Sequence, residues 1–575
     1  MKNISFIFIL LFCSFLMGSA YAEDVLGDVS ISVDNNNQQV FTEDGTSLTI
    51  TNSATLTIVP QHGININTKT NGTVTVDPGS TVTATGSNAI QGKNQSGLTV
   101  TNSGTINTAG SKAINLKDAE DSTITNNLGG IISGVGDSIS GEAATGVNIA
   151  NNGTIYSDTG SALTFFSTST ATVTNNSSGH IYNSNTYEAI KLDGSSTLTN
   201  SGKIENKNSP DNNSIVLEGN DNTITLKDKS ILVGTINAGS TTGNTLKFQH
   251  GMGQGYYYKT SGDFTLQDLD GNQVVKGSAG SVGQGASETL DELLSYKSIN
   301  LRNFFSKYNK LDDQDAWGET YVSNLKRDAH TSNLALEYDL TNFGVNLINK
   351  TDNANFVIAF EGGRQDFVKD HKIDYQNISA GIYLPQKDNP YLNLDLFILG
   401  GITLKDGERT ILTNTTTSGK LTIDSDYETY EIHTGIKKNN SSSIPDFGFA
   451  ASYSMTPSYD ESKYFSWTDR HVGNLSIFFE DDYNLINNKD SKLFLGWTLD
   501  MRKMMGDKKQ VYSINGTSAT YKQHNDLTNE ISLIANMGYE KKFSDKSKIL
   551  FSLDAKNTNR YTKSLGANIS FKSKF

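Results

Sequence analysis

Hydrophobic residues in the first half of the chain recur at a fixed interval, each time inside the same short phrase. The phrase is an apolar residue in a Thr-rich stretch, one or two Asn, a Gly, one further residue and then Ile, as in Val100 to Ile106. Its five clearest copies end at residues 106, 132, 155, 181 and 204, so the steps are 26, 23, 26 and 23 residues. Weaker copies extend the series back to Leu56 and forward to Ile231. A repeat of this length predicts a solenoid, in which each turn buries its apolar row against its neighbours.

Each repeat contains three short predicted strands. One reads Thr-Val-Thr or Thr-Ile-Thr, one reads Gly-x-Ile-x, and one carries a small-apolar pair such as Ala113-Ile114. Alternation points Val, Ile and Leu inward and Thr, Ser, Asn and Lys outward. Three strands in a turn of about 24 residues favour a right-handed parallel β-helix over residues 23–249. About eight turns at about 4.8 Å each would give a rod on the order of 40 Å long.

One Asn recurs at the same place in five successive repeats. The five are Asn102, Asn126, Asn151, Asn175 and Asn200. Asn tolerates left-handed backbone and stacked Asn side chains can form a ladder, so we favour a structural role at a corner. The alternative is a stripe that binds glycans or ions. The Gly that follows each Asn is expected to mark a tight turn.

The second half of the chain consists of long stretches in which apolar and polar residues strictly alternate. Leu493, Leu495, Trp497 and Leu499 share one face of such a stretch, and similar patterns recur up to Phe575. Apolar residues on one side and charged ones on the other, over about ten residues, are typical of transmembrane β-strands. Residues 315–575 at about 20 to 22 per strand and connection predict about 12 strands, an even number as expected.

Two segments join these halves. Residues 250–285 are Gly-rich and are predicted to cap the open end of the solenoid. Residues 286–310 are predicted to form a helix, with Ser287 as its cap and Leu290, Leu293, Leu301 and Phe304 at helical spacing. About 20 residues give a helix roughly 30 Å long, which matches the thickness of a bilayer core. An ordinary linker helix is the alternative.

The start of the chain has the pattern of a secretory signal. Lys2 precedes an apolar run from Ile4 to Met17, and Ala20-Tyr21-Ala22 is a small-x-small cleavage site, so cleavage is expected between Ala22 and Glu23. The only cysteine, Cys13, lies in this segment. The mature chain is therefore expected to lack disulfides, thiol nucleophiles and cysteine metal sites.

Composition and motifs argue against nucleic-acid binding and against the common catalytic sites. A chain of 575 residues is expected to hold at least two domains, and a formal net charge of -14 argues against a nucleic-acid partner. Motifs of serine hydrolases, zinc proteases and phosphate-binding loops are missing from the sequence. Gly136-Asp137-Ser138-Ile139 resembles an esterase box, but it lies in a Gly-rich loop between predicted solenoid strands. We predict no catalytic residue, no metal ligand and no cofactor.

Aromatic residues interrupt the polar face of the repeats at a few positions. Phe165, Phe166 and Tyr182 are candidates for a patch that contacts sugar or protein. One ring of an adjacent pair such as Phe165-Phe166 is expected to lie in the core. Any binding specificity is expected where the repeat is interrupted, at Asp118 to Asp121, Gly134 to Ala144 and Phe165-Phe166.

The order of these segments resembles the type Va autotransporters of Gram-negative bacteria over the whole chain. Trp317 to Tyr321 resembles the family's first barrel strand and Gly566 to Phe575 its last. The resemblance implies a barrel in the outer membrane, a helix in its lumen and a passenger at the cell surface. It also implies that Ile569, Phe571 and Phe575 form a signal for the barrel-assembly machinery, with periplasmic chaperones and outer-membrane lipid as further partners. The family's self-cleaving members often carry an Asn-Asn pair in the helix, and its absence between Ser287 and Tyr308 favours an uncleaved passenger.

The sequence thus predicts an all-β chain: a parallel β-helix, a linker helix and an approximately 12-stranded transmembrane antiparallel barrel. The predicted segments are 1–22, 23–249, 250–285, 286–310 and 315–575. We expect the passenger to be an adhesin or autoaggregation factor that contacts host surfaces, glycans or its own copies. The alternatives are a surface glycanase or esterase on a β-helix scaffold, and a porin-like protein with a periplasmic rod.

Overall fold

The structure is a computed structural model that describes residues 21–275, 277–282, 289–309, 316–328, 337–351, 354–386, 393–439, 444–522 and 529–574. It forms two compact units, each considered by itself. The first unit comprises Met1–Gly251, Tyr257–Ala279 and Leu412–Leu421, and the second comprises Met252–Tyr256, Gly280–Ile411 and Thr422–Phe575. The predicted signal segment up to residue 20 and the cap residue Ser287 lie outside the described residues.

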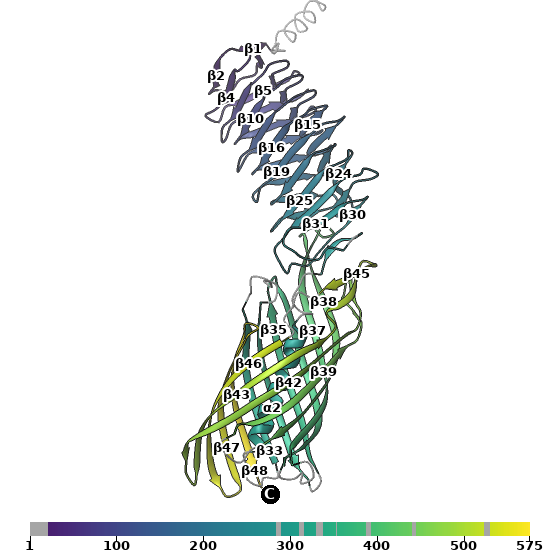
Figure 1. Cartoon of the computed structure of the whole chain (residues 1–575). Coiled ribbons are helices and arrows are strands. Elements are labelled where there is room, and N and C mark those ends of the chain that lie inside the picture. Colours follow the sequence, from purple (N-terminus) through teal and green to yellow (C-terminus); the bar gives the residue numbers. More distant parts are fainter. Residues whose placement is uncertain are drawn as a thin grey trace, which may run out of the picture. The chain divides into compact units, whose positions relative to one another are not determined.

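The first unit is a solenoid of three parallel sheets (Figure 1). The first sheet holds β1 (Ala22–Val25), β3 (Gln38–Phe41), β6 (Ile64–Asn65), β9 (Ile90–Gln91), β12 (Ile114–Asn115), β15 (Ile139–Glu142), β18 (Leu163–Phe166), β21 (Ile190–Leu192), β24 (Asn213–Leu217), β27 (Thr235–Asn237) and β30 (Thr260–Ser261). The second sheet holds β2 (Asp28–Ile31), β4 (Ser47–Ile50), β7 (Thr73–Val76), β10 (Thr99–Asn102), β13 (Thr123–Asn126), β16 (Val147–Asn151), β19 (Ala171–Asn175), β22 (Thr197–Asn200), β25 (Thr223–Lys227), β28 (Thr245–Gln249) and β31 (Thr265–Asp268). The third sheet holds β5 (Thr55–Ile58), β8 (Thr81–Ala84), β11 (Thr105–Thr108), β14 (Ile131–Gly134), β17 (Thr154–Ser157), β20 (His180–Asn183), β23 (Lys203–Asn206) and β26 (Ile231–Val233).

The solenoid is longer than the repeat phrase indicated. The third sheet has eight strands, the number of turns expected, but the first and second sheets have eleven each. Strand pairing continues before and after the repeats, because β2 pairs in parallel with β4 and β31 pairs in parallel with β28. The solenoid therefore extends past the expected end at residue 249 and into the segment expected to be its cap.

The core of the solenoid consists of columns of aliphatic side chains stacked in register. Val100 lies opposite Val74 on one side and Ile124 on the other, and Ile124 lies opposite Ile149. These side chains are fully buried or nearly so. Burying a Val or Ile side chain stabilises a fold by about 1.5–3 kcal/mol, so each turn depends on its two neighbours for its stability.

The second unit is a closed antiparallel barrel of twelve strands (Figure 1), as the alternation predicted. The strands are β33 (Ala316–Arg327), β34 (Tyr338–Lys350), β35 (Asn355–Phe367), β36 (His371–Leu384), β37 (Asp395–Thr413), β38 (Lys420–Lys438), β39 (Asp446–Thr456), β42 (Arg470–Asn487), β43 (Ser491–Gly506), β46 (Asn529–Ser544), β47 (Ser547–Thr558) and β48 (Thr562–Ser573). The first and last of these, β33 and β48, pair with each other along their whole length, and β37 pairs with β38.

Smaller elements complete the chain. A four-stranded sheet consists of β40 (Tyr459–Asp460), β41 (Phe465–Trp467), β44 (Lys509–Ile514) and β45 (Thr517–Lys522). Two short strands, β29 (Tyr256–Tyr258) and β32 (Ala279–Ser281), lie in the segment that joins the units. The helix α2 (Leu290–Asn309) runs inside the barrel (Figure 1).

None of the helical segments in the described part of the chain combines the length and hydropathy needed to cross a membrane.

The barrel carries apolar side chains outside and polar ones inside. On β47 the exposed residues Phe551 and Leu553 alternate with the buried residues Ser552 and Lys556. A closed barrel satisfies its backbone hydrogen bonds without water, and an outward apolar band is what lipid hydrocarbon accepts. The second unit is therefore a transmembrane β-barrel, and the predicted fold class is confirmed.

Candidate functional surfaces

The recurring Asn residues form a continuous hydrogen-bonded ladder inside the solenoid. The Nδ2 atom of each donates to the Oδ1 atom of the next, over 2.8 Å from Asn102 to Asn126, 2.8 Å from Asn126 to Asn151, 2.8 Å from Asn151 to Asn175 and 2.9 Å from Asn175 to Asn200. All five side chains are fully buried at the ends of strands of the second sheet. The structural interpretation therefore holds, and a binding stripe is excluded because no solvent reaches these amides. The expectation of left-handed backbone is wrong, since none of the five has a positive φ.

The Gly residues after the ladder are required by close contacts rather than by backbone angle. A Cβ atom on Gly130 would lie 2.7 Å from the carbonyl oxygen of Asn102, and one on Gly153 would lie 2.6 Å from that of Asn127. Neither Gly has a positive φ. The ladder Asn of each repeat and the Gly two or four residues after it are thus parts of one packing arrangement, in which the Gly leaves room for the ladder.

The second sheet presents a regular outer surface, here called the Thr face, made of the outward residues of β4 to β22. These residues are half-exposed or exposed and stand in register from turn to turn: Ser47, Thr49, Thr73, Thr75, Thr99, Thr101, Thr123, Thr125, Asn148, Ala150, Thr172, Thr174, Thr197 and Thr199. The seven strands that carry them contain no charged residue. The result is a flat array of hydroxyl and methyl groups that repeats about every 4.8 Å.

The third sheet differs, because aromatic and charged residues replace Thr in its later turns. The rings of Tyr156 and Tyr182 stack with centroids 4.9 Å apart, and the His180 ring lies 4.6 Å from that of Tyr182. The Nζ atom of Lys207 lies 3.3 Å from the centroid of Tyr182, within the range of a cation–π contact. A hydrogen bond of 2.8 Å joins His180 Nε2 to Glu205 Oε1. We call these five residues the Tyr patch.

Burial and neighbouring charges shift two pKa values in the Tyr patch. Burial, together with the nearby Tyr156, Asp158 and Glu205, raises the pKa of Tyr182. Burial also acts to raise the pKa of Glu205, but hydrogen bonds from His180 and Lys203 outweigh it and hold that pKa below its ordinary value. Glu205 is therefore a buried, ionised acceptor within the Tyr patch at neutral pH.

The three aromatic residues predicted to form a contact patch do not come together. Phe165 is fully buried in the first sheet, so its place in an exposed patch is corrected, whereas Phe166 is half-exposed at the end of the same strand. Tyr182 lies in the third sheet, beside Tyr156. Lys207 and His180 were not predicted from the sequence as partners of Tyr182. The 26-residue step between Tyr156 and Tyr182 was the signal that pairs these two rings.

Ser138, the residue of the esterase-like phrase, is fully buried. Its Oγ atom accepts a hydrogen bond of 2.9 Å from the Gly134 backbone N–H and donates to the carbonyl oxygen of Tyr156. A nucleophile needs an adjacent base and access to substrate, and Ser138 has a structural hydrogen-bond role instead.

Ala22 and Glu23, which flank the predicted cleavage bond, both lie in β1. Hydrogen bonds from Gln39, Asn37 and Asn35 lower the pKa of Glu23.

Inside the barrel, buried ionic contacts join α2 to several strands. Lys297 Nζ donates to Glu431 Oε1 of β38 over 2.8 Å, and Lys307 Nζ to Glu319 Oε2 of β33 over 3.1 Å. Arg302 pairs with Asp500 of β43. An apolar cluster fills the lumen at the end of the helix: Leu301, Phe304, Phe305 and Tyr308 of α2 with Trp317, Ile348, Val357, Ala359, Tyr383, Phe397, Leu399 and Leu550 of the wall.

The helix therefore fills the lumen. Two small cavities beside it have volumes of about 40 and 20 Å³, enough for one or two water molecules each. Polar residues such as Asn300, which lines both cavities, face these spaces. In this arrangement α2 is a fixed part of the barrel rather than a loose linker.

The predicted assembly signal lies on the last strand, on the lipid side. Ile569 and Phe571 are about half exposed and stand opposite Thr320 and Gly318 of β33. Phe575 lies outside the described residues. Recognition of these residues by assembly machinery stays a prediction.

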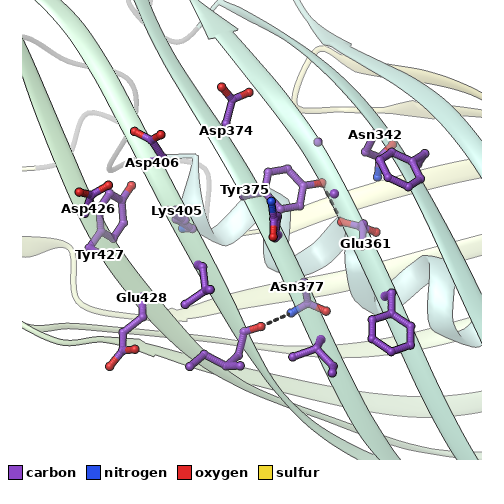
Figure 2. Close-up of a pocket in the computed structure, with 18 of the residues that line it drawn as sticks. Asn342, Glu361, Asp374, Tyr375, Asn377, Lys405, Asp406, Asp426, Tyr427 and Glu428 are labelled. Carbon is purple, nitrogen blue, oxygen red and sulfur yellow. Dashed lines mark hydrogen bonds between the residues drawn. The ribbon is translucent and has the colours of Figure 1, made fainter.

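A broad hollow of about 1390 Å³ lies on the barrel wall over β34 to β38 (Figure 2). Glu361, Tyr375 and Asn377 line it from buried positions, and the Tyr375 hydroxyl donates to Glu361 over 2.7 Å. Its other border is acidic and consists of Asp374, Asp406, Asp426 and Glu428.

Across the described residues, no group of three or more His, Cys, Asp or Glu has the geometry to hold a metal ion.

Solved structures that are similar to this chain match about half of it, at 8–11% identity. No protein family and no curated protein matches the chain. The translocator domain of the autotransporter NalP from Neisseria meningitidis is 11% identical, and the match covers 51% of this chain and 100% of that one with a TM-score of 0.36. The β domain of the Bordetella autotransporter BrkA is 10% identical over 46% and 100%, with a TM-score of 0.30. The transport unit of AIDA-I from Escherichia coli is 8% identical over 49% and 98%, with a TM-score of 0.30.

Proposed function

We propose that this chain is an autotransporter whose barrel lies in the outer membrane and whose solenoid is carried to the cell surface. Three features of the fold support this: a lipid-facing barrel, a helix held in its lumen by buried ion pairs, and a polar solenoid that precedes both in the chain. A helix anchored inside the barrel keeps the solenoid attached to it. The lumen that now holds the helix is the path along which the passenger would have passed.

The solenoid acts as an adhesin or autoaggregation factor, and the Thr face is the observation that carries this proposal. A chain with a net charge of -14 repels its own copies in most orientations. The seven uncharged strands of the Thr face remove that repulsion on one side. Two such faces pressed together form many weak hydrogen bonds, whose sum over several turns gives avidity.

Display at the surface is tested by adding protease to intact cells that express the chain. Cleavage of the solenoid with the barrel retained supports the proposal, and sequencing the released fragments shows where the exposed region ends. A solenoid that stays intact until the outer membrane is broken would refute surface display and favour a periplasmic rod.

Autoaggregation is tested by expressing the chain on a host that does not clump and following the settling of the culture. Thr99→Lys with Thr101→Lys places two charges on the Thr face and is expected to abolish settling. The matched control, Thr81→Lys with Thr83→Lys, places the same charges on the neighbouring third sheet and is expected to settle like the parent. Equal settling of all three proteins would refute the Thr face as the interface.

A further inference from the structure

The outer surface of the second sheet carries charges of opposite sign toward its two ends. Near the N-terminal end, Asp28 lies on the outward side of β2, and Asp77 directly follows β7. Near the C-terminal end, Lys227 is the last residue of β25, and Lys247 lies on the outward side of β28. All four side chains are exposed or half-exposed. The Thr face is therefore bordered by carboxylates at one end and by amines at the other.

These charges are not used up in ion pairs of the solenoid. The lysines that form ion pairs among its described residues are others, namely Lys117, Lys191, Lys203 and Lys259. The Asp28 carboxylate accepts a hydrogen bond from the Ser47 hydroxyl over 2.5 Å, which leaves its charge in place. The four charges are therefore available to a partner.

Two of the charges stand at equal distances from one central strand. In the order of the second sheet, β7 is the third strand, β16 the sixth and β25 the ninth. Asp77 follows Thr73 by four residues, and Lys227 follows Thr223 by four, so both lie in the same column of outward residues. Asp77 and Lys227 are thus related by symmetry about β16.

That symmetry is the symmetry of a pair of copies with antiparallel solenoids. Two Thr faces laid against each other in this way are related by a two-fold axis parallel to the strands, and each column then faces its own counterpart. With the axis over β16, Asp77 of each copy lies opposite Lys227 of the other. Asp28 lies one strand and one outward position from Lys247, a separation of about 8 Å that a Lys side chain can span. The pair gains four contacts between opposite charges.

A parallel pair of copies gains less from the same residues. Each strand would then face its own counterpart, so Asp28 would lie near Asp28 and Lys247 near Lys247. Lys227 would approach Asp221, which borders the opposite edge of the face together with Asp121. In the antiparallel pair both of these border residues lie opposite uncharged positions. Complementary charge therefore favours the antiparallel arrangement.

The central strand is also the one at which the Thr pattern changes. The outward residues of β16 are Asn148 and Ala150. On the two-fold axis each of them meets its own counterpart in the other copy. The amide of Asn148 can both donate and accept a hydrogen bond, so two such amides complement each other. The small Ala150 leaves room for close approach of the two faces.

We propose that two copies of this chain pair in antiparallel orientation through their Thr faces, with β16 at the centre and Asp77–Lys227 contacts on both sides of it. This pairing rests on the proposed autoaggregation and gives it a direction. The two chains continue beyond β31 at opposite ends of the pair, which suits copies that are displayed on two facing cells. Charge complementarity of this kind sets the orientation and disfavours wrong partners.

Charge reversal on displayed full-length chains tests the orientation. Asp77→Lys and Lys227→Asp each set like charges against each other, and each is expected to lower the settled fraction of cells at least tenfold. The double variant Asp77→Lys, Lys227→Asp is expected to settle like the parent. Cells that carry the two single variants, labelled in two colours and mixed, are expected to form two-coloured clumps. Asp158→Lys makes the same change in net charge beside the third sheet and is expected to leave settling unchanged.

The outcomes separate the pairing from the proposed function. Normal settling of Asp77→Lys, or a double variant as impaired as the single ones, would overturn the antiparallel pairing and leave autoaggregation intact. A parent chain that does not settle would refute autoaggregation and the pairing together.

Cross-linking tests the centre of the interface. The only cysteine of the chain is Cys13, in the predicted signal segment, so an introduced Cys is a single reactive site after cleavage. On clumped cells, a short bismaleimide linker is expected to join Asn148→Cys to its counterpart. Thr73→Cys is the control, because antiparallel pairing places it six strands, or about 29 Å, from its counterpart. At least tenfold more linked dimer is expected from Asn148→Cys, and equal amounts from the two variants would overturn the proposal.

Discussion

Side chains alternate between two faces in both the solenoid and the barrel, but the apolar face points inward in the solenoid and outward in the barrel. In the solenoid, Ile124 points into an apolar interior and Thr125 points to water. In the barrel, Phe360 points outward and Glu361 points into a polar lumen. The strand itself is alike in both, with a side-chain period of two. The medium on each side decides which residues stabilise the fold, so one substitution has different effects in the two units.

The largest expected effect comes from a charge in the solenoid core. Ile124→Lys buries an ammonium group without a partner and is expected to cost more than about 5 kcal/mol, since such groups are among the most destabilising. Thr125→Lys, the next residue, is expected to change stability by less than about 0.5 kcal/mol because it faces solvent. Resistance of the solenoid to protease in graded urea, measured on the full chain, checks both. Similar losses of stability for the two variants would contradict the assignment of residue 124 to the interior and residue 125 to the surface.

The barrel lumen contains buried charged side chains, and ion pairing offsets the cost of burying them. Arg302→Met leaves Asp500, fully buried, with fewer partners and is expected to cost about 3–5 kcal/mol. Adding Asp500→Asn is expected to recover most of that loss. All three Trp residues lie in the second unit, so Trp fluorescence during urea unfolding in detergent reports the barrel. A double variant no more stable than Arg302→Met would argue against this pair.

A Lys on the outer surface of the barrel is expected to destabilise the fold, whereas a Lys on the outer surface of the solenoid is not. Phe360→Lys places an ammonium group in the lipid zone and is expected to cost about 2–4 kcal/mol if it lies near the bilayer midplane. Thr125→Lys is the comparison on the solenoid surface, and it is followed by protease resistance in graded urea because the Trp residues report only the barrel. The same fluorescence measurement applies, made on the full chain reconstituted in bilayers. A loss below about 0.5 kcal/mol would place residue 360 outside the membrane.

Within the solenoid, the Asn ladder is expected to contribute less than the apolar columns. Asn151→Ala removes the hydrogen bonds to Asn126 and Asn175 and is expected to cost about 1–3 kcal/mol, because buried partners are left unsatisfied. Asn152→Ala changes a half-exposed neighbour and serves as the control. Protease resistance in graded urea checks the difference. Equal stability of the two variants would show that the ladder is dispensable.

The smallest effect concerns pH. The folded-state pKa of Glu205 is below the ordinary value of 4.5, so its contribution to stability is complete above that value and is lost as pH falls through the folded-state pKa. The parent solenoid is therefore expected to lose stability below pH 4.5, by an amount on the order of 1 kcal/mol. Glu205→Gln is expected to lose less over the same range. Identical pH profiles would exclude Glu205 as a contributor.

Several features could be predicted because they depend on local periodicity. The solenoid follows from a repeat step of 23 or 26 residues, and the strand number of the barrel follows from alternation and length. The helix was expected over residues 286–310 and is observed at Leu290–Asn309. The ladder role of Asn126 was also foreseen, since residues one turn apart in a solenoid must be neighbours.

Other features could not be predicted, because they depend on which distant strands lie side by side. Lys297 meets Glu431 from 134 positions away, and Lys563 meets Asp328 from 235 positions away. Which of Phe165 and Phe166 lies in the core depended on which face of one strand of the first sheet points inward. The end of the solenoid depended on strands that pair without carrying the repeat phrase.

The period of each half can be read from the residues alone, and it predicts a parallel solenoid, a helix of about 20 residues and a barrel with an even number of strands. The folded arrangement was needed to show which charges meet inside the barrel, as Lys297 meets Glu431 and Arg302 meets Asp500. The physical reason is that hydrophobic periodicity is set by each strand's own surroundings, whereas contacts across a closed barrel depend on the register of strands far apart in the chain.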